Sequence, residues 1–110
     1  MNRWTSLLIA AGAFGLIPFA VHAAGNAEAG KQKSQVCQSC HGVDGNSTNA
    51  QFPRLAGQYP DYLVQALSEY KSGARKNAIM AGFAANLSER DMEDIASYFA
   101  EQKDGLVTKR

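Results

Sequence analysis

The segment Cys37-Gln38-Ser39-Cys40-His41 constrains this chain more than any other feature of its sequence. Two thiols separated by two residues and followed directly by histidine form the attachment motif of a c-type haem. One helical turn between the cysteines lets each sulfur reach one vinyl group of the same porphyrin. The next residue then lies over the ring, where an imidazole nitrogen can bond the iron. The motif predicts covalent haem at Cys37 and Cys40, with His41 as an axial ligand.

Three other interpretations of the two cysteines are weaker. A structural disulfide would not need His41. A thioredoxin-like redox pair belongs in a βαβ context, and the sequence predicts no strands. A zinc site needs about four ligands, and the chain has no further Cys or His after His41. Haem is therefore the favoured ligand.

Residues 1–23 have the features of a cleaved secretory signal peptide. Arg3 supplies a positive charge near the N-terminus, and Leu7–Val21 is apolar apart from two glycines and a proline. Val21-His22-Ala23 then has the small residues that are typical of a cleavage site. The alternative is an uncleaved membrane anchor, but 15 apolar residues are fewer than the roughly 20 that a spanning helix needs. We expect cleavage after Ala23, with sites one residue later or three residues earlier as alternatives, and export to the periplasm.

Removal of 23 residues would leave 87 of the 110, which is enough for one domain, residues 24–110. A domain of this size buries a modest core and often needs a further stabilising group, which a covalent haem supplies. The chain carries 11 Lys and Arg against 10 Asp and Glu, so loss of Arg3 makes the mature polypeptide formally neutral. Nucleic-acid binding usually shows as a basic patch, and the local basic pair near the motif is only Lys31 and Lys33.

Three helices are expected from capping residues and apolar periodicity. The first runs from Ala27 to Cys37 after the N-cap Asn26, the second from Pro60 to Ser72, and the last from the N-cap Ser88 to Gly105. Residues 42–51 and 74–86 are predicted to be loops, and residues 106–110 a frayed tail.

Met80 lies inside the predicted loop 74–86, 39 residues after His41. An iron held by histidine on one side commonly takes a methionine thioether on the other, which raises its potential. The alternative is a methionine that fills a gap in the core. Met1 leaves with the signal peptide and Met92 lies on the apolar stripe of the last helix, so Met80 is the predicted sixth ligand.

Five other residues each have two interpretations. Gly30 marks either close approach of another helix or a tolerated glycine. The Pro53 carbonyl either orients the axial histidine or belongs to a plain loop proline. Arg54 either pairs with a haem propionate or is solvated. Tyr59 and Tyr62 either edge the haem or, as we favour, belong to the ordinary core.

Taken together, the chain resembles a class I monohaem c-type cytochrome, in particular one half of the bacterial periplasmic dihaem cytochromes. The resemblance extends over about residues 25–102, and its matching segments are Cys37–Gly42, Phe52–Gln58, Tyr62-Leu63, Gly73–Arg75 with Met80, Leu87-Ser88 and Asp94–Phe99. It implies an all-α fold of three to five helices wrapped around one covalent haem.

The resemblance also implies roles for single residues. Cys37 and Cys40 would form the thioether bonds, and His41 and Met80 would be the axial ligands. The Pro53 carbonyl would orient the histidine, and Gly30 would pack near the aromatic pair at Tyr98. Two features depart from the family pattern: Ala78 stands where many members have proline, and this chain has one haem motif where the dihaem relatives have two.

The expected function is that of a periplasmic electron carrier and not of an enzyme. An iron with six ligands has no open position, so it transfers electrons without binding a small-molecule substrate. The partners would be periplasmic or membrane-bound redox proteins. The alternatives are a haem c domain of a larger redox complex, and a small-ligand sensor or peroxidase if Met80 is not a ligand.

Overall fold

The computed structural model describes residues 11–16, 25–103 and 105. Residues 11–16 have no regular secondary structure, and the rest of the predicted signal peptide lies outside the described residues, as does the predicted tail 106–110. The regular structure of the described ranges is entirely helical, which confirms the all-α prediction. The five helices are α1 (Ala27–Lys33), α2 (Gln35–His41), α3 (Pro60–Ser72), α4 (Ala78–Ala84) and α5 (Glu89–Ala100).

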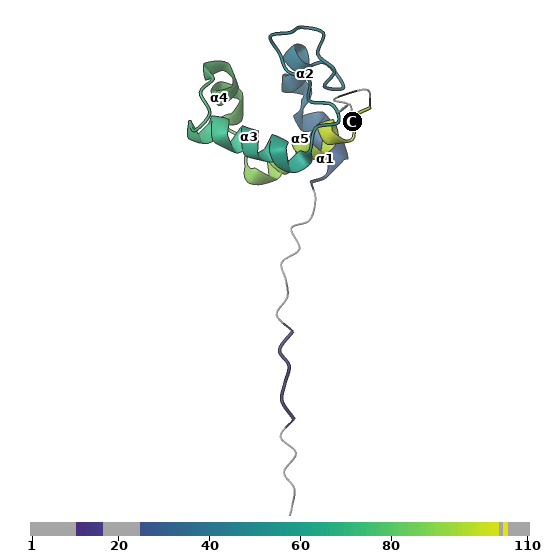
Figure 1. Ribbon diagram of the computed structural model, residues 1–110, viewed down its shortest axis with the longest axis vertical. Helices are drawn as coiled ribbons and strands as arrows, with labels where there is room; N and C mark the ends of the chain where they lie inside the picture. Colours follow the sequence, from purple (N-terminus) through teal and green to yellow (C-terminus); the bar gives the residue numbers. More distant parts are fainter. Residues whose placement is uncertain (1–10, 17–24, 104, 106–110) are drawn as a thin grey trace, which may run out of the picture.

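The helices form an open arrangement with α5 at its base. Helix α5 packs against both α1 and α3, and α4 packs against α3. Helices α2 and α4 rise on the same side of α3 and α5, at opposite ends of them (Figure 1). None of the helices in the described ranges has the length and apolar character needed to cross a membrane.

A break at Ser34 divides the helix that was predicted over residues 27–37, so that prediction is wrong in its extent. Ser34 is fully buried, and its ψ of −1° lies near the bridge region rather than at the regular helical value. Its hydroxyl donates to the Lys31 carbonyl at 3.0 Å, a side-chain bond that competes with the backbone ladder. The chain therefore starts a new helix, α2, which carries both cysteines and ends at His41.

Helix α4 was not predicted, because residues 74–86 were expected to be a loop. The helix starts at the N-cap Asn77, whose side chain accepts from the Met80 N–H at 3.0 Å. Seven residues are too few for a helix to be stable alone, so the packing of α4 on α3 is what stabilises it.

Helices α3 and α5 begin where the sequence predicts. Pro60 is at the first turn of α3, and Gly73 ends the helix with a φ of +84°. At α5 the capping box is present, since Ser88 and Asp91 each accept the other's backbone N–H, at 3.1 and 3.0 Å. The predicted end at Gly105 is wrong, because α5 ends at Ala100.

The hydrophobic core lies where α5 meets α3. Its buried members are Leu63, Ile95, Ala96, Tyr98 and Phe99. Each large side chain of this kind contributes about 1.5–3 kcal/mol through burial. The core thus holds α5 and α3 together beneath the site described below.

Gly30 is the contact point between α1 and α5, as the sequence analysis proposed. A Cβ atom built on Gly30 would overlap the backbone carbonyl of Asp94 and lie 3.0 Å from the Tyr98 Cβ. The helices can approach this closely only because Gly30 has no side chain.

Gly30→Ala is therefore expected to lower the free energy of unfolding by about 1–3 kcal/mol, the usual cost of overpacking. Gly82→Ala is the control, since Gly82 is also helical and a Cβ there would meet nothing within 4 Å. Thermal unfolding should show a lower midpoint for Gly30→Ala and an unchanged or higher one for Gly82→Ala. Equal midpoints for both variants would contradict the close helix contact.

Candidate haem site

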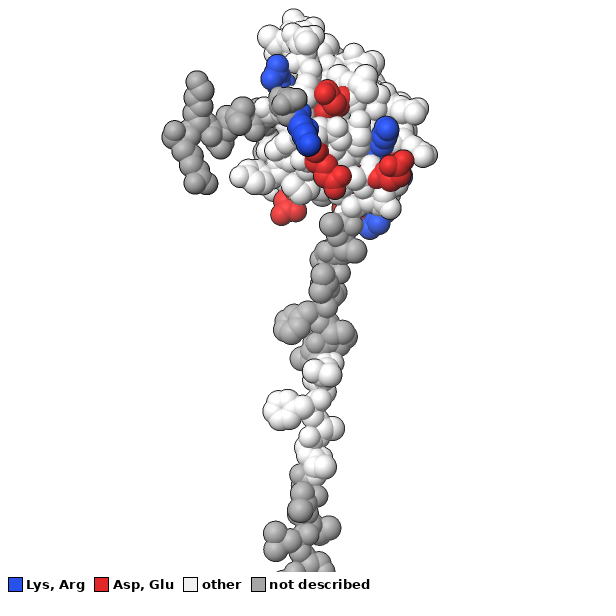
Figure 2. Space-filling model, turned by 90° about the vertical axis from the view of Figure 1, so that its right-hand side faces the viewer, with Lys and Arg blue, Asp and Glu red and all other residues white. Residues whose placement is uncertain are grey.

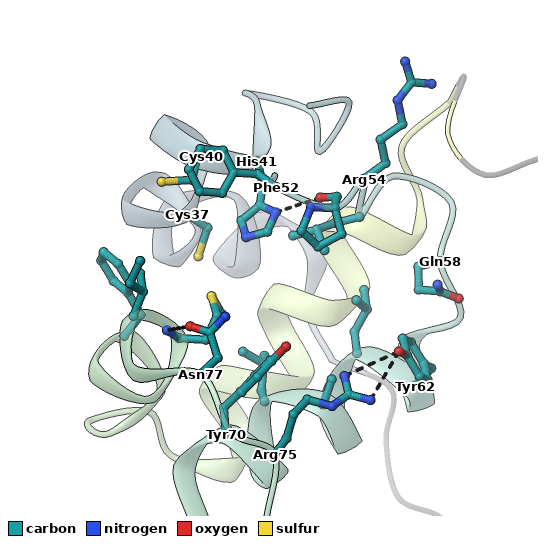
Figure 3. Close-up of a pocket in the computed structure, with 18 of the residues that line it drawn as sticks. Cys37, Cys40, His41, Phe52, Arg54, Gln58, Tyr62, Tyr70, Arg75 and Asn77 are labelled. Atoms are coloured by element: carbon teal, nitrogen blue, oxygen red, sulfur yellow. Dashed lines mark hydrogen bonds between the residues drawn. The ribbon is translucent and has the colours of Figure 1, made fainter. Parts of the chain in front are cut away.

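A cavity of about 470 Å³ lies between α2 and α4, above α3. The four residues predicted to bind haem, namely Cys37, Cys40, His41 and Met80, all line it. Figure 3 shows the residues of α2 above the cavity and those of the α3–α4 region below it. The remaining wall is largely apolar, formed by Val36, Phe52, Pro53, Leu55, Leu63, Ala66, Leu67, Ile79 and Phe83.

Helix α2 presents the motif residues to this cavity. Cys37 and Cys40, both in the described part of the chain, are free thiols and partly buried. Burial raises the pKa of the Cys37 thiol, and the neighbouring Cys40 raises it further. His41 is buried, at 7% exposure, and its ring meets Phe52 edge-on with the centroids 6.4 Å apart.

The orientation of His41 is set by the Pro53 carbonyl, which lies 2.8 Å from Nδ1. A carbonyl oxygen can only accept, so Nδ1 carries the proton and donates it. In the neutral ring the lone pair then lies on the other nitrogen, Nε2, which is the atom that can bind a metal. A backbone carbonyl that fixes the tautomer in this way is the usual support of a metal-binding histidine. The predicted role of Pro53 as this carbonyl is confirmed.

The loop that carries Pro53 is held by hydrogen bonds on both sides. The N–H of Leu55 donates to the Gly45 carbonyl at 2.8 Å, and that of Gly57 donates to the Phe99 carbonyl at 3.0 Å. The Tyr98 hydroxyl donates to the Val43 carbonyl, also at 2.8 Å. The first bond joins the segments on either side of Pro53 to each other, and the other two fix these segments to α5.

Met80 is the third residue of α4 and lines the cavity from the side opposite α2. The Asn77 side chain caps this turn by accepting from the Met80 N–H. The cap fixes the local backbone at the place where Ala78 replaces the proline of the family pattern.

Three residues with open interpretations are now placed. Arg54 is exposed, and its Nε donates to the Ser47 carbonyl at 3.3 Å. The preference for Tyr59 and Tyr62 as ordinary core residues is wrong, because they are 78% and 47% exposed. Tyr62 lines the cavity, whereas Tyr59 is not among its lining residues.

Lys33, one of the two basic residues named near the motif, does not offer a free positive charge there. Its Nζ lies 2.8 Å from Asp91 and 2.7 Å from Asp94, both on α5. Of the basic pair Lys31 and Lys33, the charge of Lys33 is thus neutralised by carboxylates of the same domain.

Four polar residues of the cavity wall were not predicted from the sequence, namely Gln51, Gln58, Arg75 and Asn77. Asn77 has a local signal, since an asparagine three residues before a helical N–H is a typical N-cap. The other three reach the cavity only through the path of the folded chain, which their local sequence does not predict.

Residues 27–103 of the chain match the family model for cytochrome c. The chain belongs to the cytochrome c family. Its expected resemblance to these proteins is therefore confirmed, and family membership identifies it as a haem c protein.

Two curated relatives illustrate the similarity. Cytochrome c4 of Pseudomonas aeruginosa is 49% identical over 104 residues, which cover 94% of this chain and 50% of that protein. Cytochrome c-554(548) of Halomonas halodenitrificans is 40% identical over 83 residues, covering 73% of this chain and all of that protein.

The fold agrees with a solved structure as well. The crystal structure of reduced recombinant cytochrome c4 from Pseudomonas stutzeri matches with a TM-score of 0.69 and 48% identity, over 73% of this chain and 47% of that one. The chain thus spans about half the length of the cytochrome c4 proteins that it matches.

The described residues fit a haem c. Both thiols, an imidazole with an available nitrogen and a thioether line the same apolar cavity. Its wall also includes two arginines, and no carboxylate of the described residues lines it. That charge balance suits a large apolar macrocycle with two propionates.

Proposed function

We propose that this cytochrome carries single electrons through one haem c attached at Cys37 and Cys40, with His41 and Met80 as axial ligands. The observation that carries the proposal is the meeting of these four side chains in one cavity, from two helices that are not neighbours in sequence. When bound, haem c supplies a reversible one-electron couple of its iron.

The protein's contribution is to hold the two axial groups and to exclude other ligands. The Pro53 carbonyl keeps the His41 Nε2 lone pair available. The neutral thioether of Met80 favours the ferrous over the ferric state, which raises the potential. With both axial positions taken by side chains, the chain transfers electrons without catalysing a reaction of its own.

The proposal places the mature protein in the periplasm. Residues 1–23 would act as the signal peptide and residues 24–110 would form the cytochrome c domain. The support for this location is the positive charge near the N-terminus, the apolar run of 15 residues and the small residues at the expected cleavage site after Ala23.

The redox partners would be periplasmic or membrane-bound proteins that meet this chain with little long-range electrostatic attraction. Lys33 and Arg90 are paired with carboxylates of α5. The described surface drawn in Figure 2 has basic and acidic side chains interspersed. Steering by charge needs a field of one sign, so short-range contacts would decide partner choice.

A second candidate is a haem c subunit of a larger redox complex. Relatives with shorter matches include the cytochrome subunit of sulfide dehydrogenase from Chlorobaculum tepidum, 36% identical over 70 residues. Another is the thiosulfate dehydrogenase electron acceptor from Thiomonas intermedia, 40% identical over 68 residues. Purification from the native host separates the candidates, because a subunit would co-purify with a fixed partner and a free carrier would not.

Covalent attachment is tested by the mass of the protein produced in cells that mature c-type cytochromes. We expect the intact mass to equal the exported polypeptide plus one haem, with no pigment extracted by acid–acetone. Replacement of both Cys37 and Cys40 by serine should abolish the added mass, whereas Ser39→Ala, between them, should keep it. A wild-type mass without haem would refute the proposed function.

A further inference from the structure

The two proposed axial ligands differ in how the fold holds them. His41 is buried, at 7% exposure, and its ring is oriented by the Pro53 carbonyl. Met80 lies near the start of α4, a helix that contacts only α3 among the described helices. The one buried residue of α4 is Ala84, at the other end of the helix. Local hydrogen bonds must therefore hold the end of α4 that carries Met80.

Asn77 supplies these hydrogen bonds with both of its oxygens. Its side-chain oxygen accepts from the Met80 N–H at 3.0 Å, and its backbone carbonyl accepts from the Ala81 N–H at 2.9 Å. Figure 3 marks the first of these bonds with the dashed line at Asn77. The first N–H groups of a helix have no partner within the helix, so the Met80 N–H depends on this side chain.

The backbone on either side of Asn77 shows why the cap matters in this chain. Upstream, the Arg75 N–H donates to the Glu69 carbonyl at 3.1 Å, which fixes the connection to α3. Downstream, Ala78 occupies the first position of α4 and leaves φ free, where a proline would have preset the helical value. Between the fixed Arg75 and the cavity, the Asn77 cap is thus what sets the direction of the turn that carries Met80.

We propose that Asn77 is the positioning residue for the sixth ligand. Its bond to the Met80 N–H keeps the first turn of α4 helical and so holds the thioether in place at the iron. The inference rests on the proposed ligation by Met80. Loss of the cap would loosen this turn while the rest of the domain stays folded, and an external ligand would then displace the thioether more easily.

The test is a titration of the ferric, haem-loaded protein with imidazole, which competes with a thioether for ferric iron. The weak far-red band of a methionine–iron bond reports how much Met80 remains bound. Asn77→Ala should lower the imidazole concentration that removes half of this band about fivefold, since loss of an asparagine N-cap changes a helical equilibrium by roughly that factor.

Two further variants separate the cap from the polarity of the cavity wall. Asn77→Ser keeps a side-chain oxygen suited to an N-cap, so the half-removal concentration should stay within about twofold of the wild-type value. Asn77→Gln keeps an amide, but its longer side chain is not that of an N-cap residue. Asn77→Gln should therefore behave like Asn77→Ala.

Asn26→Ala is the matched control for a general loss of stability. Asn26 is the N-cap of α1, and its side-chain oxygen accepts from the Ala29 N–H at 3.1 Å. The residues of α1, all of them described, do not line the cavity. Asn26→Ala should lower the thermal unfolding midpoint yet leave the imidazole titration unchanged.

The inference is overturned if Asn77→Ala needs as much imidazole as the wild type, or if Asn26→Ala lowers the requirement equally. If Asn77→Ala does not accumulate, Asn77→Ser and Asn77→Gln decide, and equal titrations of these two would overturn it. A ferric wild type without the band would refute ligation by Met80 and with it the proposed function. A wild type that has the band, with unchanged variants, would refute only the role of Asn77.

Discussion

Met80→Ala is expected to remove the weak far-red absorption band of the ferric protein, which a methionine–iron bond produces. The substitution deletes the thioether that lines the cavity from α4 and leaves the imidazole of His41 in place. Loss of this ligand should lower the reduction potential by about 0.1 V or more, within the roughly 0.8 V range that axial ligands cover. Carbon monoxide should then bind the ferrous protein readily, as it should not in the wild type.

Met92→Leu is the matched control for this experiment. Met92 is the other methionine of the predicted mature chain, and it is buried in α5 with its sulfur 3.5 Å from the Ser68 hydroxyl. A near volume-conserving change there should cost less than about 1.5 kcal/mol of stability and leave the band intact. Loss of the band in Met92→Leu but not in Met80→Ala would show that the ligand assignment is wrong. A wild type without the band that binds carbon monoxide would favour the sensor or peroxidase alternative.

Local signals explain the parts of the fold that the sequence predicts well. The capping box of Ser88 and Asp91 and the Pro60 to Gly73 boundaries of α3 are encoded within one or two turns. The Cys37–His41 motif likewise has a spacing that its chemistry requires, so all three motif side chains line the predicted site.

Tertiary contacts explain the parts that it does not. The break between α1 and α2 depends on the burial of Ser34. Helix α4 has seven residues and is stabilised by its contact with α3. Both features depend on what the folded chain packs against them, which apolar periodicity does not reveal.

The ion pairs of the two basic residues Lys33 and Arg75 also could not be predicted from the sequence. Lys33 is neutralised by carboxylates about 60 positions away, at Asp91 and Asp94. Arg75 reaches the cavity edge because Gly73 reverses the chain and Glu69 then holds the guanidinium. Such pairings depend on how helices cross, so the local sequence could not assign them.

Asp94→Asn is expected to lower the stability of the contact between α1 and α5 substantially. The carboxylate is only 4% exposed and accepts from the Asn26 N–H and the Lys33 ammonium, each at 2.7 Å. Arg90 lies 3.2 Å from the same carboxylate. Since hydrogen bonds to a charged group contribute about 1.5–3 kcal/mol, we expect a loss of about 2 kcal/mol at pH 7.

Acid should weaken the same network in the wild type. The hydrogen bond from Lys33 lowers the pKa of Asp91 to about 2 and also lowers the pKa of Asp94, assisted by backbone N–H groups. Because folding lowers the pKa of both carboxyls, their contribution is complete above the unfolded value of about 4. It is lost as the pH falls from about 4 toward 2.

Chemical denaturation at pH 7 and at pH 3 measures both effects. Wild-type stability should fall between these pH values, and Asp94→Asn should show a smaller fall because one of the two carboxyls has been removed. Glu101→Gln is the control, since this exposed carboxylate lies at the end of the same helix and has no ion pair among the described residues. If Asp94→Asn and Glu101→Gln were equally stable at pH 7 and equally sensitive to acid, the Asp94 carboxylate would not be what joins the two helices, and Gly30 packing alone would have to explain their contact.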